Sequence, residues 1–207
     1  MNNSELKIIT SHFSDIKPLI DERNNLLRQT NKVRKRLKTR LEEYGFLKDM
    51  IDIDSHGTKL VNSIVKYFKT LGFKKIENVD KNKDEDIRLW VDDKLIIFEV
   101  TGIDTPTPTD NKAHQISKHI QIRQKEYPDI KVSGLFIVNH DNKKHFLKRH
   151  KTPFRKGLDE IARTNKYTLT TTIDLFNAFI KIKNGELTKE ELVNKICLKG
   201  EMKILGS

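Results

Sequence analysis

The sequence predicts an α/β domain in which helices cover a mixed β-sheet. Three observations indicate this class: an apolar helical stripe before residue 73, a β-hairpin around residues 92–93, and a later helix followed by an almost continuous apolar run. In chain order, the predicted elements are a helix, a strand, a hairpin of two strands, a helix and a strand. Together they form an αβββαβ core. With 207 residues the chain is long enough for one such domain and an appendage.

Composition narrows the class of partner. The formal net charge of +11 and the pI of about 9.6 favour polyanions, whether nucleic acid or an anionic membrane surface. No apolar run is long enough to span a membrane and no signal-peptide pattern is present, so the sequence predicts a cytoplasmic protein without membrane association. The single cysteine, Cys197, excludes an internal disulfide and a cysteine-rich zinc site.

Residues 18–44 have the pattern of a long amphipathic helix. Apolar residues recur at spacings of three, four and seven, and the opposite face is basic, with Lys35 and Arg36 near its centre. Such a helix cannot bury its own stripe, so we expect it to pack on the following domain or on a second copy, as a homodimer. The basic face is either solvated or contacts phosphates. We predict an N-terminal helical extension over residues 1–50 and an α/β domain over residues 51–207.

The other elements follow from periodicity and stop signals. A helix through residues 60–71 ends at Gly72, and a first strand is expected from Phe73 to Val79. The remaining predicted elements are a helix from Asp110 to Glu126, a buried strand over 132–138, a helix over 154–165, a strand over 167–170, a helix opened by Thr171 or Thr172, and a helix opened by a capping box of Thr188 and Glu191.

The hairpin brings acidic residues together. With a two-residue loop at 92–93, Asp86 lies opposite Glu99, and Asp84 lies opposite Thr101. Side chains opposed in this way are about 4.5–5.5 Å apart, so two carboxylates repel each other. A shared divalent cation held by oxygen ligands removes the repulsion. The alternatives are solvated acids, or a register shifted by one residue, which would turn Asp86 to the other face.

This order of elements and acids resembles the PD-(D/E)XK restriction-endonuclease-like nucleases. Asp86 matches the acid that begins the second strand in that family, and Glu99-Val-Thr-Gly102 matches the motif that ends the third. Gln115-Ile116 is similar to the glutamine and apolar residue on the next helix. The resemblance also covers Leu71-Gly-Phe73 and, as in a bacterial subgroup, Gly134-Leu-Phe-Ile-Val-Asn139 and Leu169-Thr-Thr-Thr-Ile-Asp-Leu-Phe176.

The resemblance implies a metal-dependent endonuclease that hydrolyses phosphodiester bonds of DNA rather than RNA, in restriction or phage defence. It implies Mg²⁺ or Mn²⁺ at Asp86, Glu99 and Val100, with Thr101 and Gln115 beside the ion. His119 shares a helix flank with Gln115, where a partly buried histidine bonded to the backbone is the favoured interpretation. Nucleic-acid contacts are expected from Lys35, Arg36, Lys112, Lys118, Lys143, Lys144 and Arg149.

Two positions depart from the family pattern. The family normally has a lysine two residues after the glutamate to orient or activate the attacking water, whereas this chain has Thr101. A hydroxyl supplies no cationic charge, so either Lys118, Lys112 or Lys59 reaches the site or activity is weak or absent. Where many relatives have a glutamate on the first helix, this chain has Val61. The alternative function is therefore a catalytically weak or inactive nuclease-fold protein that binds nucleic acid or a partner.

Overall fold

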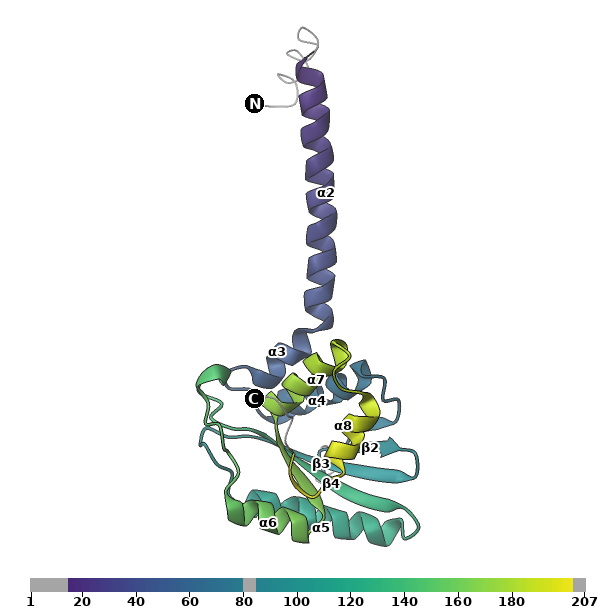
Figure 1. The fold of residues 1–207 in the computed structure, drawn as a ribbon, viewed down its shortest axis with the longest axis vertical. Helices are drawn as coiled ribbons and strands as arrows, with labels where there is room; N and C mark the ends of the chain where they lie inside the picture. Colours follow the sequence, from purple (N-terminus) through teal and green to yellow (C-terminus); the bar gives the residue numbers. More distant parts are fainter. Residues whose placement is uncertain (1–14, 80–84, 203–207) are drawn as a thin grey trace. The chain divides into compact units, whose positions relative to one another are not determined.

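The computed structural model describes residues 15–79 and 85–202, except the side chain of Lys112 (Figure 1). The chain divides into two compact units, residues 1–45 and 46–207. The boundary expected at residue 50 falls within helix α3 (Gly45–Ile51), where Phe46 and Met50 are buried. Phe46 packs against Phe179 with ring centroids 5.7 Å apart, so α3 is part of the second unit's core.

Helix α2 (Ile16–Glu43) is the described element of the first unit, and none of its residues is buried. The apolar stripe expected from the sequence is present and is exposed along the helix. Although α2 has 28 residues, neither it nor another helix in the described ranges carries a stretch apolar enough to cross a bilayer. The stripe residues Leu19, Leu26, Val33, Leu37 and Leu41 are 55–65% exposed.

The second unit contains a mixed sheet, which confirms the predicted fold class. Its strands β1 to β3 are antiparallel neighbours, and β3 to β6 run parallel. Strand β6 was not indicated by the sequence pattern, because two residues are too few to show a period. In spatial order, the described strands are β1 (Ile76–Asn78), β2 (Ile87–Val91), β3 (Lys94–Gly102), β4 (Lys131–Asn139), β5 (Tyr167–Thr171) and β6 (Gly200–Glu201).

Helices cover both faces of the sheet. Figure 1 shows α5 (Asp110–Glu126) and α6 (Lys156–Thr164) on one side, and α4 (Gly57–Thr70) and α7 (Thr172–Lys183) on the other. Alternate residues of β3 reach the two layers: Ile97 packs in one cluster with Ile116 of α5, whereas Phe98 meets Phe68 of α4 with ring centroids 5.0 Å apart. The odd-numbered residues of β3 therefore face α5.

Gly134 in β4 permits the close approach of α5 to the sheet. A Cβ at this position would lie 2.8 Å from the Cδ1 atoms of Ile116 and Ile120 and 2.9 Å from the Cβ of Tyr167. These distances are too short for a methyl group, so the absence of a side chain sets the spacing between α5 and β4.

Two helices begin with reciprocal caps. The capping box predicted at Thr188 and Glu191 is confirmed at the start of α8 (Lys189–Ile196), and α7 begins with a second box formed by Thr171 and Asp174. Each box satisfies backbone N–H groups that have no partner within the helix. The Thr171 box thus fixes where the chain turns from β5 into α7, and the Thr188 box fixes the start of α8 after the turn that follows α7.

Candidate active site

The hairpin has the register that its two-residue loop predicts. Val91 pairs with Lys94 and Ile87 with Phe98, which is the predicted register. The paired residues end at Ile87 and Phe98, and Asp86 directly precedes this last pair, so the predicted pairing of Asp86 with Glu99 stays a prediction. Asp84, which is predicted to face Thr101, lies outside the described residues. For residues 87–91 and 94–98 these pairs exclude the alternative register, shifted by one residue.

Glu99 and Thr101 lie on the face of the sheet that α5 covers. This follows from alternation along β3, because Leu95 and Ile97 pack into the cluster that contains Ile116 of α5. Thr101 is buried and Glu99 is partly exposed. The carboxylate and the hydroxyl therefore belong to the layer between the sheet and α5, at the carboxyl end of β3.

Hydrogen bonds fix Asp86 beside the end of β3. Its backbone N–H donates to the Phe98 carbonyl at 3.0 Å, and its own carbonyl accepts from the Val79 N–H at 3.0 Å. The side-chain Oδ2 accepts from the Val100 N–H at 2.6 Å. These three bonds hold the Asp86 carboxylate at the peptide that follows Glu99.

The chemistry of this strand end fits a hard cation. The carboxylates of Asp86 and Glu99 and the carbonyl of Val100 supply only oxygen, which is what Mg²⁺ and Mn²⁺ prefer. Within the described ranges, no group of three or more His, Cys, Asp or Glu side chains could hold a metal ion. A metal here would therefore use the two carboxylates together with a backbone oxygen.

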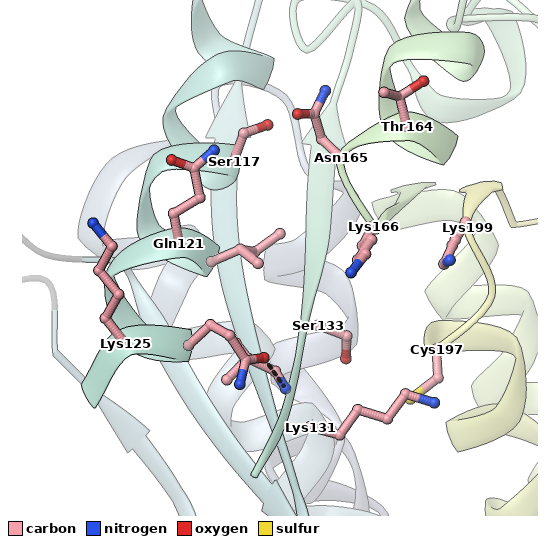
Figure 2. Close-up of a pocket in the computed structure, with 13 residues that line it drawn as sticks. Ser117, Gln121, Lys125, Lys131, Ser133, Thr164, Asn165, Lys166, Cys197 and Lys199 are labelled. Carbon is pink, nitrogen blue, oxygen red and sulfur yellow. Dashed lines mark hydrogen bonds between the residues drawn. The ribbon is translucent and has the colours of Figure 1, made fainter. Parts of the chain in front are cut away.

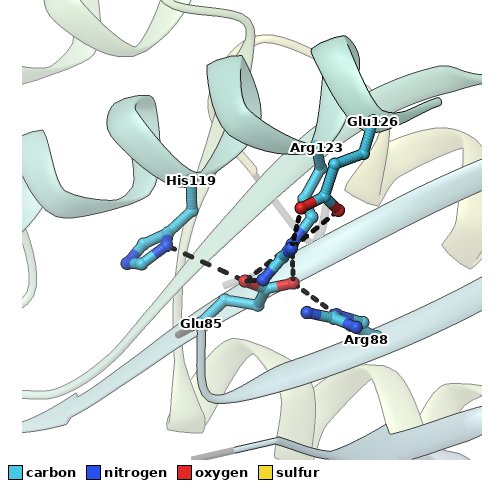
Figure 3. Close-up of polar contacts among 5 residues, drawn as sticks. All are labelled: Glu85, Arg88, His119, Arg123 and Glu126. Carbon is cyan, nitrogen blue, oxygen red and sulfur yellow. Dashed lines mark hydrogen bonds and ion pairs between the residues drawn. The ribbon is translucent and has the colours of Figure 1, made fainter. Parts of the chain in front are cut away.

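Glu85 is the centre of a buried ionic network next to Asp86 (Figure 3). Its side chain is 1% exposed and accepts from Arg88 Nε at 2.5 Å and from Arg123 Nε at 2.8 Å. Arg123 Nη2 donates to the same carboxylate at 2.9 Å, and Arg123 Nη1 donates to Glu126 at 2.7 Å. His119 borders the network, with Nδ1 3.7 Å from Glu85 Oε2.

Electrostatics keep this carboxylate ionised. Burial raises the pKa of the Glu85 carboxyl, but hydrogen bonds from Arg123 and Arg88 outweigh it and hold the pKa below its usual value. Because Glu85 directly precedes Asp86 and Arg123 belongs to α5, the network joins the start of β2 to the helix that covers the site. It thereby helps to position Asp86.

The motif spacing does not reveal Glu85 or Arg123. A signal is nevertheless present on α5, where Ala113, Ile116 and Ile120 form an apolar stripe that position 123 continues. An arginine on such a stripe requires a buried anion, since a buried charge is costly unless it is paired. Searching for that anion among the acids before β2 would have led to Glu85.

Gln115 is exposed on α5, one turn before His119, which is partly buried. Gln115, His119 and Arg123 follow one another at spacings of four residues, so they form one flank of the helix. That flank lies toward β2, because His119 and Arg123 both contact Glu85. Gln115 is therefore on the side of α5 that faces the acidic hairpin.

The three lysines considered as replacements for the missing cation differ in position. Lys59 lies with Nζ 3.1 Å from Asp49 Oδ1 and 3.8 Å from Asp52 Oδ2, so its charge is engaged near α3. Lys118 is exposed on α5, and the side chain of Lys112 lies outside the described part. Val61 on α4, which stands where the family pattern has a glutamate, is 3% exposed and belongs to the apolar core.

Lys143 and Lys144 lie near the carboxyl end of β3. Lys143 pairs with Asp54, and Lys144 Nζ lies 3.0 Å from Asp141 Oδ1. Both side chains are more than half exposed. A cavity of about 400 Å³ runs past Lys143 and is also lined by Asp54, His56, Gly102, Ile103, Asp104, Thr105 and Asn142.

Arg149 does not fit the predicted role in nucleic-acid contact. It is 6% exposed, and its guanidinium donates to Asn139 Oδ1, to the Ile51 carbonyl at 2.8 Å and to the Lys144 carbonyl at 3.1 Å. Burial lowers the pKa of Arg149. Arg149 therefore joins the end of β4 to the segment before α4, and its role is structural.

The mixed sheet, its flanking helices and the acid-bearing hairpin define a restriction-endonuclease-like fold. No protein-family model and no curated protein matches the chain. The structure is similar to that of the restriction endonuclease FokI, with a TM-score of 0.51, 17% identity and coverage of 76% of this chain. For FokI bound to DNA the TM-score is 0.54, with 16% identity and coverage of 79% of this chain.

The chain spans 30% of the FokI chain in both comparisons. The small subunit of the heterodimeric restriction endonuclease R.BspD6I gives a TM-score of 0.46, with 13% identity over 65% of this chain and 74% of that subunit. At these identities the FokI similarity shows the fold alone. Activity and substrate depend on the residues of this chain.

Proposed function

We propose that this chain is a metal-dependent endonuclease that hydrolyses phosphodiester bonds of DNA. The observation that carries the proposal is the hydrogen bond of 2.6 Å from the Val100 N–H to Asp86 Oδ2, which puts the Asp86 carboxylate at the peptide that follows Glu99. Two carboxylates in this relation are destabilising unless a cation or solvent separates their charges. The net charge of +11 supports a polyanionic substrate.

In this proposal Asp86, Glu99 and the Val100 carbonyl are the ligands of Mg²⁺ or Mn²⁺. A bound divalent ion would stabilise charge on the reacting phosphate and lower the pKa of the attacking water. The Val100 N–H keeps the Asp86 carboxylate in place, and the Glu85 network fixes the strand from which Asp86 projects. Gln115 would donate hydrogen bonds to a phosphate oxygen or to water.

The hydroxyl of Thr101 would orient water without supplying positive charge. We propose Lys112 as the residue that compensates, because it precedes Gln115 by three residues and His119 by seven, the spacing of one helix flank. Lys118 is the second candidate on α5, whereas Lys59 is engaged by Asp49 and Asp52.

DNA contacts would come from basic residues on two parts of the chain. In the second unit they are Lys112, Lys118, Lys143 and Lys144, and on α2 they are Lys35 and Arg36. Contacts to phosphates release counterions, so binding should weaken steeply with salt. Arg149 is left out of this set because it is buried.

We also propose that α2 pairs with α2 of a second copy. The exposed apolar stripe supports this association, because a helix cannot bury such a stripe by itself. Sedimentation of the full chain as a monomer, unchanged by Leu26→Lys, would contradict this pairing.

A role in restriction or phage defence in the cytoplasm remains part of the proposal. The second candidate function is a nuclease-fold protein that binds nucleic acid without cutting it. It is favoured by Thr101, which replaces the cationic group of the family motif, and by Val61, which replaces an acid.

The test is a cleavage assay on supercoiled plasmid, single-stranded DNA and RNA, in EDTA, Mg²⁺ or Mn²⁺. The variant is Glu99→Gln, and the matched control is Glu160→Gln, an exposed carboxylate on α6. We expect DNA cleavage that requires metal, is lost in Glu99→Gln and persists in Glu160→Gln. Cleavage that survives in Glu99→Gln would contradict the proposed site. Salt-sensitive DNA binding by both variants without any cleavage would favour the second candidate.

A further inference from the structure

Helix α5 separates the acidic hairpin from a cavity of about 600 Å³ on its other flank (Figure 2). One wall consists of Ser117, Ile120, Gln121 and Gln124 of α5. No residue of the proposed active site lines this cavity. Lys125 extends the first wall near the end of α5. The other walls are the start of β4, the end of α6 with the turn that leads to β5, and the segment after α8, through Lys131, Val132, Ser133, Thr164, Asn165, Lys166, Cys197 and Lys199.

The cavity is lined by four lysines and by no carboxylate. Lys125, Lys131, Lys166 and Lys199 come from four separate segments of the chain. Within residues 15–79 and 85–202, none of the four forms an ion pair. Like charges gathered around one cavity repel each other, so the cavity attracts an anion.

A buried hydroxyl on the cavity wall also lacks a partner. Ser117 is 8% exposed, and its Oγ has no hydrogen bond to any described group. Buried hydroxyls are normally satisfied, and each exception calls for an explanation. Ser133, also 8% exposed, lines the same cavity from β4. Two small donors thus lie within the basic ring.

The backbone is strained at the same place. Lys166 has a φ of 62°, in the left-handed region that side chains other than glycine rarely adopt. Such conformations cost of the order of 1–3 kcal/mol and concentrate where ligands bind. Lys166 follows the C-cap of α6, so a lysine occupies the turn position where glycine is more usual, and this turn borders the cavity.

We propose that this cavity binds a nucleoside triphosphate. The lysines and the two serine hydroxyls suit the phosphates, the amides of Gln121 and Asn165 suit hydrogen bonds to a base or sugar, and Ile120 and Val132 offer an apolar surface. The volume is that of a small-molecule site, for which roughly 300–1,000 Å³ is usual, whereas duplex DNA requires an open surface. The proposal does not depend on the nuclease activity.

The experiment is calorimetric titration of the full chain with ATP, GTP, CTP and UTP, alongside inorganic triphosphate and adenosine. We expect saturable binding of one nucleoside triphosphate per chain that is tighter than for either fragment. Lys131→Met and Lys199→Met should each weaken it at least tenfold, and Ser117→Ala about threefold, the order expected for one lost hydrogen bond. Lys69→Met, an exposed lysine on α4, is the control and should bind as the wild type does.

Circular dichroism melts establish that each variant folds, and Ser117→Ala should melt no lower than the wild type because it removes an unsatisfied hydroxyl. The proposal is overturned if none of the four nucleotides binds saturably, or if Lys131→Met and Lys199→Met bind like Lys69→Met. Loss of DNA-duplex binding in the same variants, without nucleotide binding, would overturn it as well and assign the lysines to a DNA-contacting surface.

Discussion

The carboxylate of Asp86 accepts a hydrogen bond of 2.6 Å from the backbone N–H of Val100, across the hairpin that joins β2 to β3. The bond holds this side chain at the peptide that follows Glu99 on β3, as the proposed shared site requires. The hairpin thus explains how acids 13 residues apart in the sequence can share a ligand.

The first prediction concerns the missing lysine. Thr101→Lys restores the cationic group of the family motif at a position beside α5. We expect it to raise the metal-dependent cleavage rate at least tenfold, since groups that move or orient protons contribute about 10²–10⁴-fold when present. The measurement is single-turnover cleavage of an end-labelled duplex. Thr101→Met, which matches the length without the charge, should give no gain. Equal rates for the two variants would contradict a need for charge.

The second prediction concerns the pair of Glu85 and Arg123. Arg123→Met removes the guanidinium that donates to the buried Glu85 carboxylate. We therefore expect a loss of about 3–5 kcal/mol in the free energy of unfolding. Urea denaturation measures this loss. The double variant with Glu85→Gln removes the buried charge and should recover part of the stability. Losses that simply add in the double variant would show that the two side chains are not coupled.

The third prediction concerns the contact of α5 with the sheet. Gly134→Ala should lower the free energy of unfolding by about 1–3 kcal/mol, because the new methyl group collides with Ile116 and Ile120. Gly157→Ala on α6 is the matched control, since a Cβ there meets nothing within 4 Å. Alanine in a helix is favoured over glycine, so the control should gain about 0.5–1 kcal/mol. Equal effects at the two positions would contradict the packing described here.

The fourth prediction concerns pH. Burial lowers the pKa of His140, whose Nε2 lies 2.9 Å from the His150 carbonyl, and the charge of Arg149 lowers it further, while Asp141 and Asp174 oppose the shift. Below about pH 6.5, the usual value for histidine, the unfolded chain therefore binds more protons than the folded one at this residue. The free energy of unfolding should thus fall as the pH drops from 7 toward 5.

His140→Gln should make that fall shallower, as measured by urea denaturation at several pH values. The difference between the wild type and the variant isolates His140 from the other histidines. Identical slopes for the two proteins would show that His140 does not carry the effect.

Local patterns predicted much of this fold. The apolar spacing of Ala113, Ile116 and Ile120 identified α5, and the loop at residues 92–93 predicted the register that pairs Ile87 with Phe98. Both depend on neighbours in sequence, for which helix and hairpin periodicity are reliable guides. The capping box at Thr188 was predictable for the same reason.

Contacts between distant segments were not predictable in this way. Glu85 and Arg123 are 38 residues apart, and neither belongs to a spacing motif. Arg149 was interpreted as a surface cation because its neighbours are basic, yet it donates to the carbonyl of Ile51, 98 residues earlier. The lysine-lined cavity combines four segments whose proximity depends on the order of strands in the sheet.

The most direct test of the shared metal centre is Mn²⁺ binding, followed by electron paramagnetic resonance of the free ion. Asp86→Asn, Glu99→Gln and the double variant are compared with the wild type. If both acids hold one ion, each single substitution should weaken binding at least tenfold, and the double variant should lose little more. Wild-type affinity in either single variant would contradict a metal site shared by Asp86 and Glu99.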